Sequence, residues 1–329
     1  MDQENKVLRF GAAIILCAIV FRLLSGGILA PVAELLQNPK AVELLMFLET
    51  GRSVRLSEGI EDTPQWTAES PVPELQATLP SIAPVFRAQD LELVELRNSV
   101  SWNPDLEGLL TEPVTLSLRD DAPTVLILHS HATECYTKVT GQNYTESGSY
   151  RTLDENYNLL RVGDELAQKL EAAGIHVIHD RSLHDYPSYN DSYSHARTSL
   201  KEHLAKYPSI DLVLDIHRDA ANTADGQLAT HESNGETEAA QLMLVMGTGA
   251  NGQSHPNWRQ NLSLALKLQV QLERLFPGIC RPLSLRGSRF NQDLHPNMVL
   301  VEVGAAGDTL EEALAAIEPL AQAIISLSG

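Results

Sequence analysis

Residues 156–178 read NYNLLRVGDELAQKLEAAGIHVI, and this stretch decides the class of fold. Apolar side chains recur at helical spacing up to residue 173, Gly174 then ends the helix, and residues 175–178 have the apolar character of a strand. Residues 124–128, TVLIL, form an all-apolar run that suits a strand buried on both faces. A strand, a helix and a second strand in this order indicate a parallel sheet covered by helices.

The same alternation continues to the end of the chain. Helical spacing predicts two further helices, at residues 194–206 and 258–275, and apolar runs predict strands at 210–216, 241–246 and 298–303. Asp308 as N-cap and Glu311 three positions later form a capping box that opens the last helix. The sequence therefore predicts an α/β fold, a three-layer αβα domain with a mainly parallel sheet, over residues 121–329.

An apolar stretch at residues 7–30 predicts a single transmembrane helix near the N-terminus. Lys6 and Arg9 favour a cytoplasmic tip, so residues 1–30 are expected to be the anchor and the rest of the chain to lie outside the cell membrane. The alternative is a cleaved signal peptide, but Pro31 directly follows the small residues at its end and makes a poor cleavage site.

Residues 31–120 predict a juxtamembrane segment followed by an acidic stalk that contains many prolines. The chain has 329 residues and a formal net charge of −19, which would repel a polyphosphate. Nucleic acid is therefore excluded as a partner.

Polar clusters follow or interrupt three of the apolar strands. They are HSHATE at residues 129–134, DIHRD at 215–219, and Glu302 within VLVEVG. Imidazole and carboxylate groups are the usual ligands of a catalytic Zn²⁺, and a free carboxylate beside its water can serve as general base. Arg218 or Asp219 would orient a ligand. The alternative is ordinary polar residues at strand ends, with Glu302 paired to an arginine such as Arg289.

At these residues the sequence resembles the stage II sporulation protein P family, the engulfment hydrolases of endospore-forming bacteria. The matching stretches span most of residues 124–320. They are LHSHATECY at 128–136, NYNLLRVGDEL with AGIHVIHDRSLHDYPSYNDSY at 156–193, DIHRDA at 215–220, RFNQDLHP at 289–296 and LVEVGAAGDTLEEA at 300–313. The single N-terminal anchor matches the family as well.

The resemblance implies a relative of zinc-dependent N-acetylmuramoyl-L-alanine amidases. Such an enzyme removes stem peptides from the glycan strands of peptidoglycan. The resemblance also implies that the enzyme can cut cross-linked peptides. The resemblance places the metal ligands at His131, Glu134 and His217 and the general base at Glu302. It further implies stage II sporulation proteins D and M as partners.

Two assignments remain open at the metal. Asp154 or Glu155, at the start of the first helix, could replace Glu134 as the carboxylate ligand. Cys135 could instead be a nucleophile with a histidine as base, although no setting that lowers a thiol pKa is visible. Cys135 and Cys280 could also form a disulfide or remain free thiols.

The groups expected to contact the substrate lie around the same strands. They are His129, Arg218, Arg289, Asn291 and Gln292. Residues 185–193, which are rich in tyrosine, form either a wall of the substrate groove or a loop packed on itself. The rival functions are an anchored cell-wall-binding or scaffold protein without catalysis, and a metal-independent peptidase or esterase. No GxSxG motif supports the second of these.

Overall fold

The computed structural model describes residues 84–328, except 114–115, 148, 224–225, 228 and 234–237. The predicted anchor at residues 1–30 and the juxtamembrane segment therefore lie outside the described residues. Within the described part of the chain, no helix is both long and apolar enough to cross a membrane.

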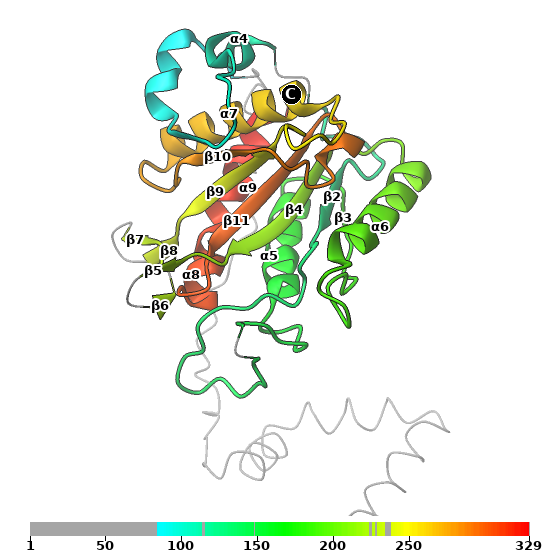
Figure 1. The fold of residues 1–329 in the computed structure, drawn as a ribbon, viewed down its shortest axis with the longest axis vertical. Helices are drawn as coiled ribbons and strands as arrows, with labels where there is room; N and C mark the ends of the chain where they lie inside the picture. The colour runs from blue at the N-terminus through cyan, green and yellow to red at the C-terminus, as the bar shows by residue number, and fades with distance from the viewer. Residues whose placement is uncertain are drawn as a thin grey trace, which may run out of the picture. The chain divides into compact units, whose positions relative to one another are not determined.

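A seven-stranded sheet forms the centre of the folded unit (Figure 1). Its order is β1 (Leu96–Asn98), β10 (Leu283–Arg286), β9 (Leu242–Gly247), β11 (Met298–Ala305), β4 (Leu212–Asp219), β2 (Val125–Leu128) and β3 (Val177–His179). Neighbouring strands run parallel except β9 and β11, which are antiparallel. The prediction of a mainly parallel sheet is confirmed, and the predicted strands at 210–216, 241–246 and 298–303 correspond to β4, β9 and β11.

Helices cover the two faces of this sheet unequally. The larger core packs α5 (Leu159–Ala172), α7 (Trp258–Leu275) and α9 (Ile317–Leu327) on one face, behind the sheet in Figure 1. On the other face α6 (Ser192–Lys206) packs over β2 and β4 in a smaller cluster. Over β9 and β11 that second face carries only a small apolar patch, against which Phe290 packs.

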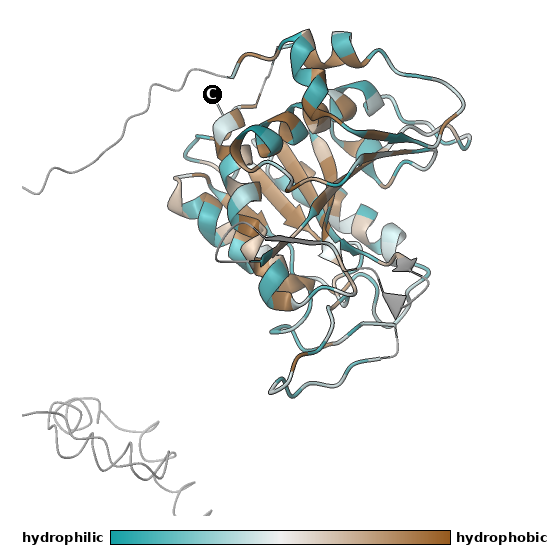
Figure 2. Ribbon diagram, turned by 90° about the vertical axis from the view of Figure 1, so that its left-hand side faces the viewer, coloured by the Kyte–Doolittle hydropathy of each residue, from teal (hydrophilic) through white to brown (hydrophobic). Residues whose placement is uncertain are grey.

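Alternation along β11 assigns its side chains to the two faces. Val299, Val301 and Val303 belong to the larger core, whereas Leu300 belongs to the patch on the thinly covered face. Because side chains alternate along a strand, Glu302 shares the face of Leu300. The strands at the centre of the folded unit are coloured mostly as hydrophobic, whereas the helices around them carry both hydrophobic and hydrophilic residues (Figure 2).

The described residues before 121 are part of the folded unit and not of a stalk. β1 pairs with β10, and α4 (Leu106–Thr111) buries Leu109 and Leu110 completely. The compact unit spans Ala77–Gly329. The predicted domain start at residue 121 was therefore too late, because a three-residue strand and a six-residue helix are too short to show periodicity.

Short elements complete the fold. They are the 3-10 helices η1 (Ala88–Leu93) and η2 (Gln292–Leu294), helix α8 (Leu310–Ala315), and two hairpins, β5 (Asn222–Thr223) with β6 (Gly226–Gln227) and β7 (His231–Ser233) with β8 (Glu238–Ala240). The capping box of α8 is one residue later than predicted, with Thr309 as N-cap and Glu312 as its partner. Asp308 instead accepts hydrogen bonds from the backbone of Thr230 and Ala305.

Candidate active site

Two histidines far apart in sequence meet on the thinly covered face of the sheet. His131 follows β2 and His217 lies within β4, whose strand continues to Asp219 rather than ending before the histidine. Their ring centroids are 5.3 Å apart and the rings are nearly perpendicular. Both side chains are buried. Pairing of β2 with β4, which aligns Leu128 with Asp215, brings the two rings together.

Glu302 lies directly beside His217 on the neighbouring strand. The two residues are register partners in the parallel pair of β11 and β4, so their side chains project from the same face. Oε2 of Glu302 is buried and has no hydrogen-bond partner among the described residues. Burial raises the pKa of Glu302 to about 8, against the opposing effect of His217 and with a further increase from Glu134.

The two histidines carry different charges in this setting. Burial alone would lower the pKa of His217, but the carboxylates of Asp215 and Glu134 raise it to about 9. Burial and the neighbouring His217 lower the pKa of His131 to about 3. Nε2 of His217 lies 2.9 Å from Oδ1 of Asp215, an ion pair that contributes to this increase. Asp215 itself is held by the backbone and hydroxyl groups of Ser130.

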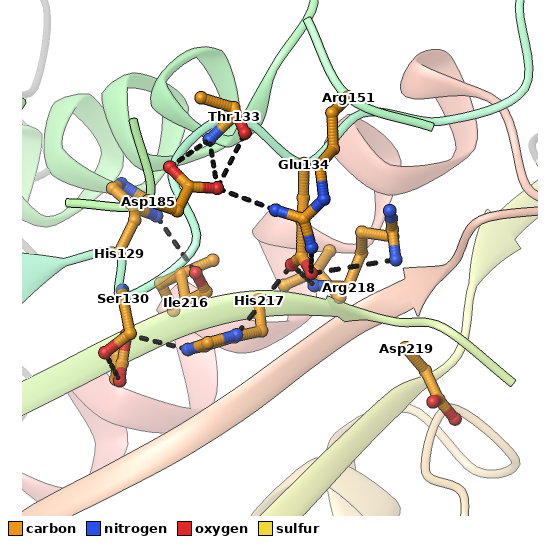
Figure 3. Close-up of polar contacts among 12 residues, drawn as sticks. His129, Ser130, Thr133, Glu134, Arg151, Asp185, Ile216, His217, Arg218 and Asp219 are labelled. Atoms are coloured by element: carbon orange, nitrogen blue, oxygen red, sulfur yellow. Dashed lines mark hydrogen bonds and ion pairs between the residues drawn. The ribbon is translucent and has the colours of Figure 1, made fainter. Parts of the chain in front are cut away.

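Two arginines hold the carboxylate of Glu134 (Figure 3). Nη2 of Arg151 lies 3.2 Å from Oε1, and Nη1 of Arg218 lies 3.7 Å from the same oxygen. Oε2 is 3.8 Å from Nδ1 of His217. Asp219 lies apart from this group and pairs with Arg281. Glu134 therefore borders the histidine pair, but its charge is already balanced by guanidinium groups.

Sequence reasoning missed Arg151, which lies in a loop and has no periodic or motif signal. Its other terminal nitrogen, Nη1, donates a hydrogen bond of 2.7 Å to Asp185. Its guanidinium also stacks on the ring of Tyr189, 4.4 Å from the centroid. Tyr189 in turn stacks on His131. Arg151 thus links Glu134 to the tyrosine-rich segment.

The tyrosine-rich segment lies against the histidine pair. Tyr189 is half exposed and stacks on His131 at 4.7 Å between centroids. Tyr193 contacts His131 edge-on at 5.4 Å and lies nearly parallel to His217 at 6.3 Å. Of the two interpretations from sequence, this geometry favours a wall beside the site over a loop packed only on itself.

Two residues expected to contact substrate have partners within the fold. His129 is fully buried, with Nδ1 bonded to the carbonyl of Ile216 and Nε2 lying 2.8 Å from Nε2 of His179. Arg218 is also buried and donates to the carbonyl groups of Cys135 and of residues 149–150. The partners of both side chains come from distant segments that sequence spacing does not reveal, and the predicted contacts with substrate stay predictions.

The segment at residues 289–292 divides between structure and surface. Gln292 is fully buried, and its amide bonds to the backbone of Gly247 and Val245. Asn291 is buried as well and bonds to Arg197 and to the Tyr193 carbonyl. Their side chains are engaged within the fold, and their predicted substrate contacts stay predictions.

Arg289 alone among these residues remains partly exposed. Its Nε lies 3.5 Å from Asp293, and its side chain lines a pocket. Its predicted role stays a prediction.

The alternatives left open by the sequence have different outcomes. The carboxylate of Glu155 is exposed and pairs with Arg181 at 2.6 Å, and Asp154 accepts hydrogen bonds from Asn156. Cys135 is buried, and burial raises its pKa to about 12, which disfavours a thiolate nucleophile. Cys135 and Cys280 are both free thiols.

Unpaired buried atoms test whether these residues suit a metal ion. Among the described residues, no group of three His, Cys, Asp or Glu side chains is arranged closely enough to hold one as it stands. Yet Nδ1 of His131, Nε2 of His217 and Oε2 of Glu302 are buried without hydrogen-bond partners. Such atoms are costly unless a ligand satisfies them, and imidazole and carboxylate are donors that Zn²⁺ prefers. The donor types fit zinc, with Glu134, whose Oε2 lies 3.8 Å from Nδ1 of His217, as the carboxylate ligand.

Comparisons with known proteins give the following similarities. The sequence profile described as Stage II sporulation protein P (SpoIIP) matches residues 68–325. Stage II sporulation protein P from Bacillus subtilis (strain 168) is 29% identical, and the match covers 58% of this chain and 48% of that protein. The match thus spans about half the length of that relative.

Solved structures give two further similarities. The CwlD amidase from Clostridioides difficile, determined in complex with the GerS lipoprotein, is 16% identical with a TM-score of 0.38, over 61% of this chain and 94% of that chain. An N-acetylmuramoyl-L-alanine amidase from Clostridium difficile 630 is 20% identical with a TM-score of 0.35, over 63% of this chain and 97% of that chain.

Proposed function

Because the chain belongs to the stage II sporulation protein P family, we propose that it is a zinc-dependent hydrolase of peptidoglycan acting in engulfment. The bond cleaved is the amide between N-acetylmuramic acid and the L-alanine of the stem peptide. One observation carries this proposal: His131 and Glu302 both lie beside His217, and each has a buried atom, Nδ1 of His131 and Oε2 of Glu302, without a hydrogen-bond partner among the described residues. That arrangement supports an enzyme over a scaffold protein, in which these costly groups would have no use.

His131 and His217 would hold the metal, with Glu134 as the third ligand once it turns from its arginine partners. Bound Zn²⁺ would polarise the scissile carbonyl and make the attacking water more acidic. Asp215, fixed by Ser130, would keep the His217 ring in position.

Glu302 would accept the proton of the attacking water and return it to the leaving nitrogen. Its pKa, raised to about 8 by burial, lies in the range in which a carboxyl group both takes up and releases a proton near neutral pH. Glu302 is half-buried and lies beside His217 on the neighbouring strand.

The proposal includes the cellular location of the enzyme and its protein partners. Residues 1–30 would anchor the chain in the cell membrane and leave the folded unit on the side of the wall. This placement would confine hydrolysis to the peptidoglycan next to one membrane. Stage II sporulation proteins D and M are the proposed partners, by family membership.

The first prediction tests the general base. Glu302→Gln keeps the size and position of the side chain but removes its basicity. We expect zinc binding to be unchanged and turnover to fall by roughly 10²- to 10⁴-fold. Mass spectrometry of the stem peptides released from purified peptidoglycan by the full-length chain measures this loss.

Three controls accompany that measurement. His131→Ala and His217→Ala should lose both metal and activity, and Arg259→Met, an exposed change on α7, should alter neither. Release of peptides in excess chelator, or normal turnover by Glu302→Gln, would contradict the mechanism. Muropeptides cut within the cross-link rather than at L-alanine would reassign the bond.

A further inference from the structure

A pocket of about 430 Å³ adjoins the histidine pair on the thinly covered face of the sheet. Its walls are the start of α6, with Tyr193 and Arg197, and the loop that carries Ser288, Arg289 and Phe290. The Tyr193 ring contacts both histidines and lies 6.0 Å from the Phe290 ring. The pocket and the candidate active site therefore share Tyr193 as a wall.

This pocket is positively charged in a chain of net charge −19. Arg197 binds Asp293 through two hydrogen bonds of 2.8 and 2.7 Å. Arg289 reaches the same carboxylate only through Nε, at 3.5 Å, so two arginines share one aspartate. Among the described residues, no carboxylate pairs with the two terminal nitrogens of Arg289. These nitrogens are a planar fork suited to binding a carboxylate.

The loop that presents Arg289 is rigidly braced. Phe290 and Asn291 both have positive φ, 51° and 58°, a backbone conformation that non-glycine residues adopt only where surrounding contacts enforce it. The buried amide of Gln292 bonds on one side to Gly247 N and on the other to Val245 O. A site held in place before the ligand arrives binds it with less loss of entropy.

A second pocket, of about 700 Å³, lies on the side of the loop after β2 and is unsuited to an anion. Asp154 and Asp185 both line it. Arg151 is the positively charged side chain that lines this pocket, and its two terminal nitrogens already pair with Glu134 and Asp185. A carboxylate would be repelled there, so charge alone distinguishes the two pockets.

We propose that the Arg289 pocket is the subsite for the peptide arm of the substrate, and that Arg289 binds the free α-carboxylate of the second stem-peptide residue. This rests on the proposed function. It fixes the direction of the substrate, with the stem peptide running from the histidine pair past Tyr193 to Arg289. It also makes the enzyme selective for peptidoglycan in which that carboxyl group is not amidated.

The test compares two disaccharide-tetrapeptides that differ only at the second residue, D-glutamate or D-isoglutamine. With the zinc-loaded full-length chain, we expect kcat/KM to favour the free acid by roughly tenfold or more. Arg289→Met should abolish that preference mainly through KM, and Arg289→Lys should keep part of it. Arg259→Met is the matched surface control and should keep all of it.

Binding to the unreactive Glu302→Gln chain, measured by calorimetry, separates this proposal from the proposed function. The free acid should bind roughly tenfold tighter than the amide, and the added Arg289→Met change should remove the difference. If neither compound is hydrolysed but the binding preference holds, the proposed hydrolytic function is contradicted and the proposed subsite is supported. Equal binding of the two compounds, or a preference that survives Arg289→Met, overturns the subsite.

Discussion

The buried Lys267 is held by one partner from a distant segment and one from its own helix. Lys267 in α7 is buried, and its ammonium group donates to the carbonyl of Leu109 and the hydroxyl of Ser263. Burial lowers the pKa of Lys267 from 10.5 to about 8, and the nearby Glu112 opposes this only partly. The neutral amine is therefore favoured in the folded state relative to the unfolded chain.

A prediction on pH and stability follows from Lys267. Because its folded pKa lies below its unfolded pKa, the unfolded chain binds more protons between pH 8 and 10.5. Relative to Lys267→Met, the free energy of unfolding of the natural chain should rise by up to about 3 kcal/mol across this window. Urea denaturation of both chains at several pH values measures this difference in the free energy of unfolding. The titration of tyrosines and cysteines contributes equally to both chains and therefore cancels. A constant difference would contradict the assignment.

Glycine decides how close two elements approach at the end of β9. A Cβ on Gly247 would lie 2.4 Å from the carbonyl oxygen of Ser288 and 2.8 Å from Cα of Arg289. Both contacts are with backbone, which cannot move aside cheaply. The glycine thus lets the loop that carries Arg289 lie directly against the strand.

Gly247→Ala should therefore lower the free energy of unfolding by about 1–3 kcal/mol. Gly287→Ala is the matched control in the same loop, because its added Cβ would meet only the flexible side chain of Asn251. Chemical denaturation of the two variants measures the contrast. Equal stabilities would show that the loop shifts without cost.

At the scale of the whole molecule, the folded unit leaves part of one sheet face thinly covered by helices. The larger core lies behind β9, β11 and β4, while α6 covers only the β2 side of the opposite face. His217 and Glu302 lie on this part of the face, within β4 and β11, and His131 lies three residues after the end of β2.

A prediction at the scale of the whole molecule concerns the segment before residue 121. A chain that begins at residue 121 would lack β1, exposing the edge of β10, and would lose the buried Leu109, Leu110 and Leu118. Burial of each leucine contributes about 1.5–3 kcal/mol, and a domain is stable by only about 5–15 kcal/mol. We expect this chain to show no cooperative thermal transition, whereas one that begins at residue 77 should. Equal thermal transitions of the two chains would instead support the prediction that the segment before residue 121 is a stalk.

The sequence by itself determined most strands and helices of the fold, but not β1, α4 or β10, and it marked His131, His217 and Glu302 as candidates whose roles stay predictions. These depend on local patterns: apolar runs, helical spacing, Gly174 as a stop, and polar groups interrupting apolar strands. Such patterns are complete within a few residues, so they can be read without the fold. The one-residue shift of the capping box to Thr309 shows where even a local pattern was ambiguous.

Only the tertiary structure decided what each polar side chain contacts. His129 lies against His179, 50 positions away, and Arg218 binds carbonyl groups 68 and 69 positions away. Gln292 is bound to a strand 45 and 47 positions earlier. The physical reason is that a hydrogen bond is satisfied by whichever group the packing brings near, and sequence spacing does not encode that proximity. Packing likewise leaves the terminal nitrogens of Arg289 at a pocket, without a carboxylate partner among the described residues. Its neighbours Asn291 and Gln292 form hydrogen bonds within the fold.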